Sequence, residues 1–104
     1  MIYLLATVQL NTGKLQEFSD ILSKEYLPLA EKQGQKLVGT WRTVVGNVDE
    51  VIDLWAFDSL EHFAKVRASL AQNPEWQKAY VRLRATVAAE NHRIISPLAF
   101  SPLK

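Results

Sequence analysis

The chain of 104 residues has 48% hydrophobic and 22% charged residues, a composition typical of one globular domain and not of a disordered or fibrous protein. Its 12 basic and 11 acidic side chains leave a net charge of +1, so no bulk field attracts nucleic acid or an acidic membrane. The lack of cysteine excludes disulfides, thiolate metal sites and cysteine nucleophiles. The apolar start is too short for a membrane span and has no signal-peptide features, so we expect a cytoplasmic protein with no nucleic-acid or membrane partner.

The first half of the chain predicts a strand, a helix and a second strand. Residues 2–10 are apolar in both alternating rows, which predicts a strand covered on both faces. Residues 14–33 have helical periodicity, with a kink or break expected near Pro28, because proline lacks an amide proton and clashes with the preceding turn. Residues 35–45 predict the second strand, and residues 46–50 a hairpin turn to the next one. One row of the second strand is expected to hold Leu37, Gly39, Trp41, Thr43 and Val45.

The second half begins with residues 51–57, six of them apolar, which predict a strand at the centre of a sheet. Asp58 to Glu61 resembles a capping box at the start of a second helix. Asn73-Pro74-Glu75 is a start signal for a third, short helix. Residues 85–95 predict the last strand, followed by an extended tail. The helix positions expected to face the core are Leu60, Phe63, Ala64, Val66 and Leu70, then Trp76, Tyr80, Val81 and Leu83.

This order of elements predicts one α+β domain over residues 1–104 with a ferredoxin-like fold. In it a four-stranded antiparallel sheet has helices on one face, and right-handed crossovers place strands one and three in the middle. If the helices cover the row that contains Ile52, the opposite row with Asp53, Trp55 and Phe57 faces water. So large an apolar face is rare in monomers. We therefore expect an obligate homodimer packed sheet against sheet.

Several short motifs occur in an order that is specific as a set. They are Tyr3, Thr12-Gly13-Lys14-Leu15 with Phe18, Leu27-Pro28-Leu29, Leu37-Val38-Gly39-Thr40-Trp41, Gly46, Leu54-Trp55-Ala56-Phe57-Asp58-Ser59, Asn73-Pro74-Glu75-Trp76, Glu90-Asn91-His92-Arg93-Ile94 and Phe100-Ser101-Pro102. Together they resemble the NIPSNAP family over essentially the whole chain, although family patterns often have Pro-Gly-Lys where Thr12-Gly13-Lys14 stands here. The resemblance implies a dimeric α+β barrel but no agreed reaction. Without the leader and second domain of long mitochondrial members, their membrane and trafficking roles are not expected.

His92 is the first candidate catalytic residue, in the most polar run of any predicted strand. Alternation places Glu90 and His92 on one face of that strand and Asn91 and Arg93 on the other. A histidine beside a carboxylate can titrate near neutrality and act as a base. The alternative is a charged edge strand that pairs with Arg42 or with a partner subunit.

His62 is the second candidate catalytic residue, because a positive helix end disfavours a protonated imidazole and ligand pockets often open there. The alternative is a surface or capping residue. His62, His92 and Glu90 would also make a ligand set suited to iron or zinc. Their spacing matches no sharp metal motif, so no metal or other cofactor is predicted.

Aromatic residues make up the third candidate feature, as the lining of an apolar pocket or as plain core packing. The candidate ligand-binding residues are Tyr3, Trp41, Trp55, Asn91 and Arg93. Asp53 is expected to face the dimer interior, where a cross-interface ion pair with Arg42 or Arg93 is favoured over catalysis.

Two functional hypotheses follow. In the first, a homodimer binds a small apolar or aromatic molecule in the cleft between sheet and helices, and as an enzyme it would resemble the cofactor-free oxygenases and isomerases built on such barrels. In the second, the chain is a non-catalytic interaction or scaffold module whose polar residues serve the dimer. Phosphoryl transfer, serine hydrolysis and dinucleotide binding have no support, because their motifs are missing.

Overall fold

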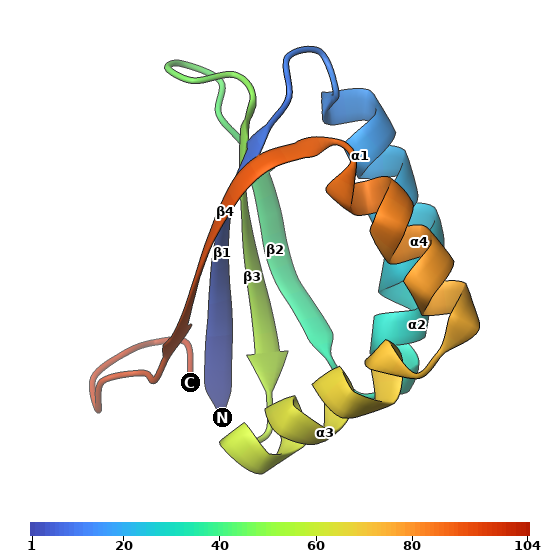
Figure 1. The fold of residues 1–104 in the computed structure, drawn as a ribbon. Coiled ribbons are helices and arrows are strands. Elements are labelled where there is room, and N and C mark those ends of the chain that lie inside the picture. Colours follow the sequence, from blue (N-terminus) through green and yellow to red (C-terminus); the bar gives the residue numbers. More distant parts are fainter.

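One antiparallel sheet with all helices on one side organises the computed structural model, which describes residues 1–104 (Figure 1). The sheet has four strands in the order β2-β3-β1-β4. This confirms the ferredoxin-like α+β fold, with the first and third strands in the middle. The elements in chain order are β1 (Ile2–Leu10), α1 (Leu15–Ile21), η1 (Leu22–Tyr26), α2 (Leu27–Lys32), β2 (Lys36–Arg42), β3 (Glu50–Phe57), α3 (Leu60–Ala71), α4 (Pro74–Arg84) and β4 (Val87–Ile95).

The irregularity predicted near Pro28 is a single π-helical turn, η1, between α1 and α2. Pro28 has no amide proton to donate to the carbonyl one turn back, so the chain widens there without ending the helix. The wider turn leaves Leu22 and Tyr26 both buried on the side that faces the sheet.

Strand β2 departs from the predicted alternation. Its pairing with β3 shifts between Leu37 and Gly39, so that Leu37 lies opposite Trp55 and Trp41 lies opposite Ile52. The irregularity moves Leu37 and Trp41 to opposite faces of the sheet. The prediction that they share a row was therefore wrong.

The two later helices begin at capping residues, one of them misassigned from the sequence. The N-cap of α3 is Ser59, whose hydroxyl accepts a hydrogen bond from the His62 amide, so the predicted capping box was out by one residue. The cap of α4 is Asn73, as predicted, and its side chain accepts from two backbone amides of the first turn.

The helix faces differ from the prediction at their edges. Val66, Leu70 and Leu83 are buried as expected. Leu60 is 61% exposed and Val81 is 69% exposed, so these two positions were wrong. Ala64 is also exposed.

The helices cover the row of β3 that was expected to lie bare. Trp55 is only 4% exposed, and its ring meets Tyr26 of η1 edge to face with centroids 5.8 Å apart. Phe57 packs against Phe63 of α3 in the same way at 5.0 Å. The expectation that Asp53, Trp55 and Phe57 face a second subunit was wrong, because this aromatic row fills the space between sheet and helices.

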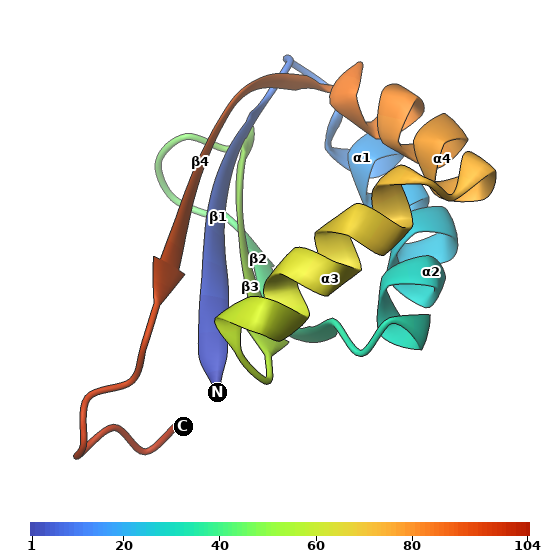
Figure 2. The same ribbon diagram turned by 60° about the horizontal axis from the view of Figure 1, so that its bottom comes forward.

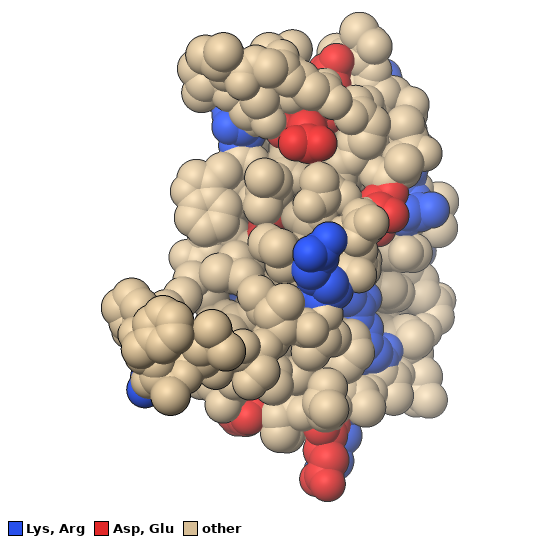
Figure 3. All heavy atoms as spheres, turned by 90° about the vertical axis from the view of Figure 1, so that its left-hand side faces the viewer, with Lys and Arg blue, Asp and Glu red and all other residues tan.

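The other sheet face, here called the open face, is not covered by any helix (Figure 2). It is formed by Tyr3, Leu5 and Thr7 of β1, Ile52, Leu54 and Ala56 of β3, Trp41 of β2, and Asn91, Arg93 and Ile95 of β4. Figure 3 shows this side as largely uncharged and hollowed between two projecting parts. An apolar open face therefore exists, but it is made by the opposite row from the one assumed.

No helix combines the length and the apolar character needed to cross a bilayer.

Candidate functional site

A cavity of about 60 Å³ lies between the sheet and the helices, and we call it the cleft. Its sheet side includes Ala6 of β1, Asp53 of β3 and His92 of β4. Its helix side includes Tyr26 of η1 and Tyr80 of α4. The cleft is therefore enclosed by elements from both halves of the chain.

The floor of the cleft follows from the strand register. Ala6 of the central strand lies opposite Asp53 on one side and opposite His92 on the other. Opposed residues on neighbouring strands point to the same face, and the strands lie about 4.8 Å apart. The small alanine side chain therefore leaves space between a carboxyl group and an imidazole whose backbones are roughly 10 Å apart.

Asp53 is a buried acid without a basic partner. It is 4% exposed, and its Oδ1 accepts a hydrogen bond of 2.5 Å from the Thr40 hydroxyl. Burial raises the pKa of Asp53 above its usual range, with the Thr40 hydrogen bond acting in the opposite direction. The ion pair predicted with Arg42 or Arg93 is not formed, because Asp53 lies on the helix side of the sheet.

His92 and Glu90 form a pair at the solvent-exposed end of the cleft. His92 Nε2 donates to Glu90 Oε2 over 3.1 Å, and Arg84 of α4 lies 3.4 Å from the same oxygen. The hydrogen bond from His92 is the main reason that the pKa of Glu90 is lowered. The predicted alternation of this run is confirmed, and β4 is an edge strand. The partner of Glu90 is Arg84 and not Arg42.

Polar atoms without partners lie beside the cleft. Gln35 is 1% exposed, yet neither its amide nitrogen nor its amide oxygen has a hydrogen-bond partner within the protein. The indole nitrogen of Trp76, whose ring stacks on Tyr80 at 4.5 Å, also lacks one. Leaving such a group unpaired costs about 1–3 kcal/mol, so a bound molecule or ordered water is the expected partner.

Tyr26 completes the polar lining on the helix side. Burial raises the pKa of its phenol, while the charge of Arg67 and the nearby side chains of Gln35 and Trp76 oppose this effect. Sequence reasoning missed both Tyr26 and Gln35. No spacing motif marks them, because they come together only through the packing of η1 against the start of β2.

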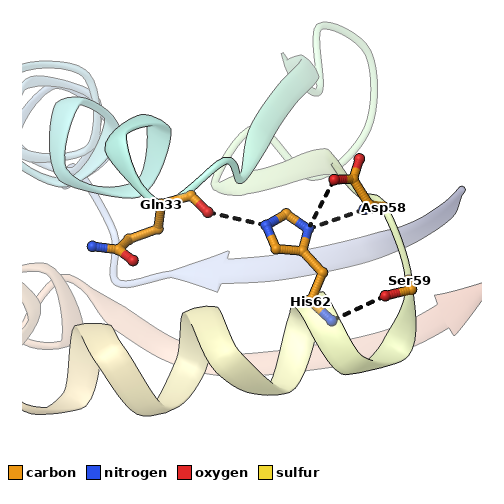
Figure 4. A network of polar contacts seen from close by, with 4 residues as sticks. All are labelled: Gln33, Asp58, Ser59 and His62. Atoms are coloured by element: carbon orange, nitrogen blue, oxygen red, sulfur yellow. Dashed lines mark hydrogen bonds and ion pairs between the residues drawn. The ribbon is translucent and has the colours of Figure 1, made fainter.

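His62 lies outside the cleft and is held by backbone groups (Figure 4). Its Nδ1 accepts from the Asp58 amide over 3.0 Å, and its Nε2 donates to the Gln33 carbonyl over 3.0 Å. Both ring nitrogens of the neutral imidazole are thus occupied in tying the start of α3 to the end of α2. We therefore do not assign a proton-transfer role to His62. Nor does it join a metal site with His92, since no three potential ligands gather anywhere in the chain.

The structure divides the predicted ligand-binding residues between two sides of the sheet. Trp55 lines the cleft, whereas Tyr3, Asn91 and Arg93 lie on the open face. Trp41 also lies on the open face and is 54% exposed. The five residues therefore do not form one site in a single chain.

A second hollow of about 310 Å³ runs between α1, η1 and the edge strand β2. It is larger than the cleft and includes Leu15, Leu37 and Trp41. Unlike the cleft, it has no fully buried polar group among its lining residues. Specific recognition needs a few convergent polar groups, so the cleft is the stronger candidate for a ligand site.

The NIPSNAP family model matches residues 3–102. The proteins named NipSnap homolog 3A from Homo sapiens and Pongo abelii are each 31% identical to the chain over 74 residues. These residues are 69% of this chain but only 29% of either relative, so the chain spans a minor part of their length.

Solved structures show the same similarity. A NIPSNAP family protein from Agrobacterium tumefaciens has a TM-score of 0.91 at 29% identity, with 99% of this chain and 98% of that chain covered. A NIPSNAP domain protein from Burkholderia xenovorans has a TM-score of 0.89 at 29% identity, with 98% and 99% covered. A monooxygenase-like protein from Nitrosomonas europaea shares only the fold, at 10% identity and a TM-score of 0.72 over 94% and 99% of the two chains. Because the family model covers nearly all residues and solved members have the same fold, this chain belongs to the NIPSNAP family.

Proposed function

We propose that this chain binds a small, largely apolar molecule in the cleft. The observation that carries the proposal is Gln35, a fully buried amide with a free donor and a free acceptor beside a cavity. Native proteins leave few such groups unpaired, and those that persist are concentrated where something binds. The composition favours a cytoplasmic location for this role.

The cleft favours a ligand with a compact polar head. Its walls include Leu4, Phe18 and Trp55, and its volume of about 60 Å³ suits two or three non-hydrogen atoms on the scale on which about 150 Å³ holds benzene. The rest of the ligand would lie toward the exposed end beside His92. An apolar wall with a few placed polar groups is typical of small-molecule sites.

As an enzyme, the protein would use His92 as its proton-transfer group. Glu90 occupies Nε2 and leaves Nδ1 as the free basic nitrogen. The monooxygenase-like protein from Nitrosomonas europaea contributes only a shared architecture to this argument, because 10% identity transfers no residue role.

Ligand-observed NMR with a library of small fragments tests the binding proposal. Ala6→Leu fills the floor of the cleft, and Gln35→Met removes its unpaired amide at similar size. Fragments that bind the native protein should lose binding in Ala6→Leu, and those with a polar head should weaken in Gln35→Met. Gln72→Met, at an exposed position, is the matched control. Unchanged binding in both cleft variants would contradict the proposal.

The open face supports a homodimer as the functional unit. The accessible surface of the chain is 6568 Å², whereas a monomer of 11.8 kDa is expected to expose about 5,900 Å². The excess is on the order of the 800 Å² that each partner contributes to a standard interface. It includes the loop with Val45, 92% exposed, and the tail with Phe100, 84% exposed. Both segments project on the side of the open face (Figures 1 and 3).

Light scattering coupled to size exclusion tests the dimer. The native chain should have twice its mass of 11.8 kDa. Leu54→Glu places a charge at the centre of the open face and should give a monomer. Val81→Glu puts the same charge at an exposed apolar site on α4 and should leave the dimer intact. A native monomer at micromolar concentration would refute this part of the proposal.

The alternative is a non-catalytic interaction module that uses the same exposed apolar loop and tail. It is favoured if the chain dimerises through the open face while no fragment binds in the cleft.

A further inference from the structure

We propose that the cleft transfers a proton on a small ketone, with Asp53 holding the carbonyl oxygen and His92 taking a proton from the adjacent carbon. This inference rests on the proposed function, because it names the ligand class and the chemistry of the same cleft. It uses Asp53, which was predicted to serve only an ion pair.

The strand register supplies the geometry. Asp53, Ala6 and His92 form one row across β3, β1 and β4, all on the helix side of the sheet. The methyl group of Ala6 leaves a gap between the acid and the imidazole. A carbonyl oxygen, its carbon and one neighbouring carbon are the two or three atoms that a cavity of about 60 Å³ accommodates.

The surroundings of Asp53 suit a hydrogen-bond donor. The Thr40 hydroxyl occupies Oδ1, so Oδ2 is the atom left for a ligand. No cation pairs with this carboxyl, and burial favours the protonated form, which donates to a carbonyl oxygen. A carboxylic acid kept neutral by an apolar site is an established way of stabilising an enol.

The surroundings of His92 suit a base. Glu90 accepts the proton on Nε2, which fixes the tautomer with a free lone pair on Nδ1. Glu90 is the second carboxyl of the cleft, and its environment lowers its pKa where that of Asp53 is raised. Two carboxyl groups with opposite shifts in one cleft indicate separate acid and base functions. Arg84 offsets the charge of Glu90, and Arg67 lies near the helix side of the cleft.

The step balances without a co-reactant. The bond from the adjacent carbon to hydrogen breaks, and the proton moves to Nδ1 of His92. The electron pair left behind forms a carbon–carbon double bond, and the carbonyl π pair moves to oxygen, which receives the proton of Asp53. The product is the enol. Return of the proton from His92 to the same or another carbon, and of the hydroxyl proton to Asp53, regenerates both groups and exchanges or isomerises the ketone.

Proton exchange in deuterium oxide tests this assignment. Acetone, hydroxyacetone and pentane-2,4-dione serve as probes, with saturation-transfer NMR for binding and proton NMR for deuterium uptake next to the carbonyl. At least one probe should bind and exchange about 100-fold faster than in buffer. His92→Gln should return exchange to the buffer rate. Asp53→Asn should keep binding but slow exchange at least tenfold, and Glu61→Gln, an exposed carboxylate on α3, should change nothing.

The failures separate the two proposals. Binding without accelerated exchange overturns the proton-transfer assignment and leaves the binding site standing. Binding of other fragments in the cleft while all three ketones fail overturns the ligand class. Acceleration that persists in His92→Gln, which is partly exposed and expected to fold, refutes the role of that histidine.

Discussion

Replacing Asp53 by asparagine should make the protein more stable at neutral pH. The carboxyl group is 4% exposed and has no cationic partner. Asparagine keeps an acceptor oxygen for the Thr40 hydroxyl, which lies 2.5 Å from Oδ1. The substitution therefore removes a buried charge while preserving the hydrogen bond and the volume.

The expected gain is about 1 kcal/mol. Each pKa unit by which burial raises the pKa of Asp53 disfavours the ionised folded state by about 1.36 kcal/mol at neutral pH. Substitutions that relieve such a functional site typically gain about 0.5–2 kcal/mol. For a domain of this size, a gain of about 1 kcal/mol raises the melting temperature by roughly 5 °C.

The pH dependence gives the prediction its sign. Because the pKa of Asp53 is higher in the folded chain, the folded state binds the proton more tightly than the unfolded state. The contribution of Asp53 to stability is thus fully present below the unfolded pKa of about 3.9 and is lost as pH rises through the folded pKa. Glu90 acts in the opposite sense, because its pKa is lowered, but its contribution is common to both proteins.

Urea unfolding of both proteins at neutral pH and near pH 4 measures the difference. The asparagine variant should be more stable at neutral pH, and its advantage should shrink at the acidic pH. A variant that is less stable at neutral pH, or an advantage that does not change with pH, would refute the description of Asp53 as a buried and unpaired acid.

Three further predictions concern the scaffold and the cleft. His62→Ala removes the contacts of both ring nitrogens and should lower the unfolding free energy by about 1–3 kcal/mol without changing fragment binding, as measured by urea titration and NMR; equal stability would contradict its structural role. Gly34→Ala should destabilise the fold in the same assay, because Gly34 has φ +85° and a Cβ there would lie 2.9 Å from the imidazole of His62; a neutral result would mean that the contact is not maintained in solution. Gln35→Met should hold or raise the melting temperature while weakening polar ligands, and a large loss of stability would show that the amide is paired.

Local signals predicted the order of elements well. The Asn73-Pro74 start, the polar run on β4 and the disturbance near Pro28 were read correctly, because each depends on neighbouring residues. The shifted register of β2 was missed, since alternation alone does not predict an extra residue. The Trp41 ring lies over Gly39, where a Cβ would be only 2.4 Å from it, and this contact became visible only in the structure.

The side of the sheet that receives the helices was not predictable from pattern. Both rows of β3 are apolar, so hydrophobicity did not distinguish them. The outcome depends on shape, with Trp55 meeting Tyr26 and Phe57 meeting Phe63 across the layer. The candidate site had the same difficulty, because Gln35 and Tyr26 come together only when the helices pack on the sheet.

A crystal structure of the protein with a bound fragment tests the central claim most directly. The account predicts a polar head group between Asp53 and His92 that pairs with the free amide of Gln35. Fragments found only in the hollow beside β2 or on the open face, with Gln35 paired to the protein itself, would contradict it.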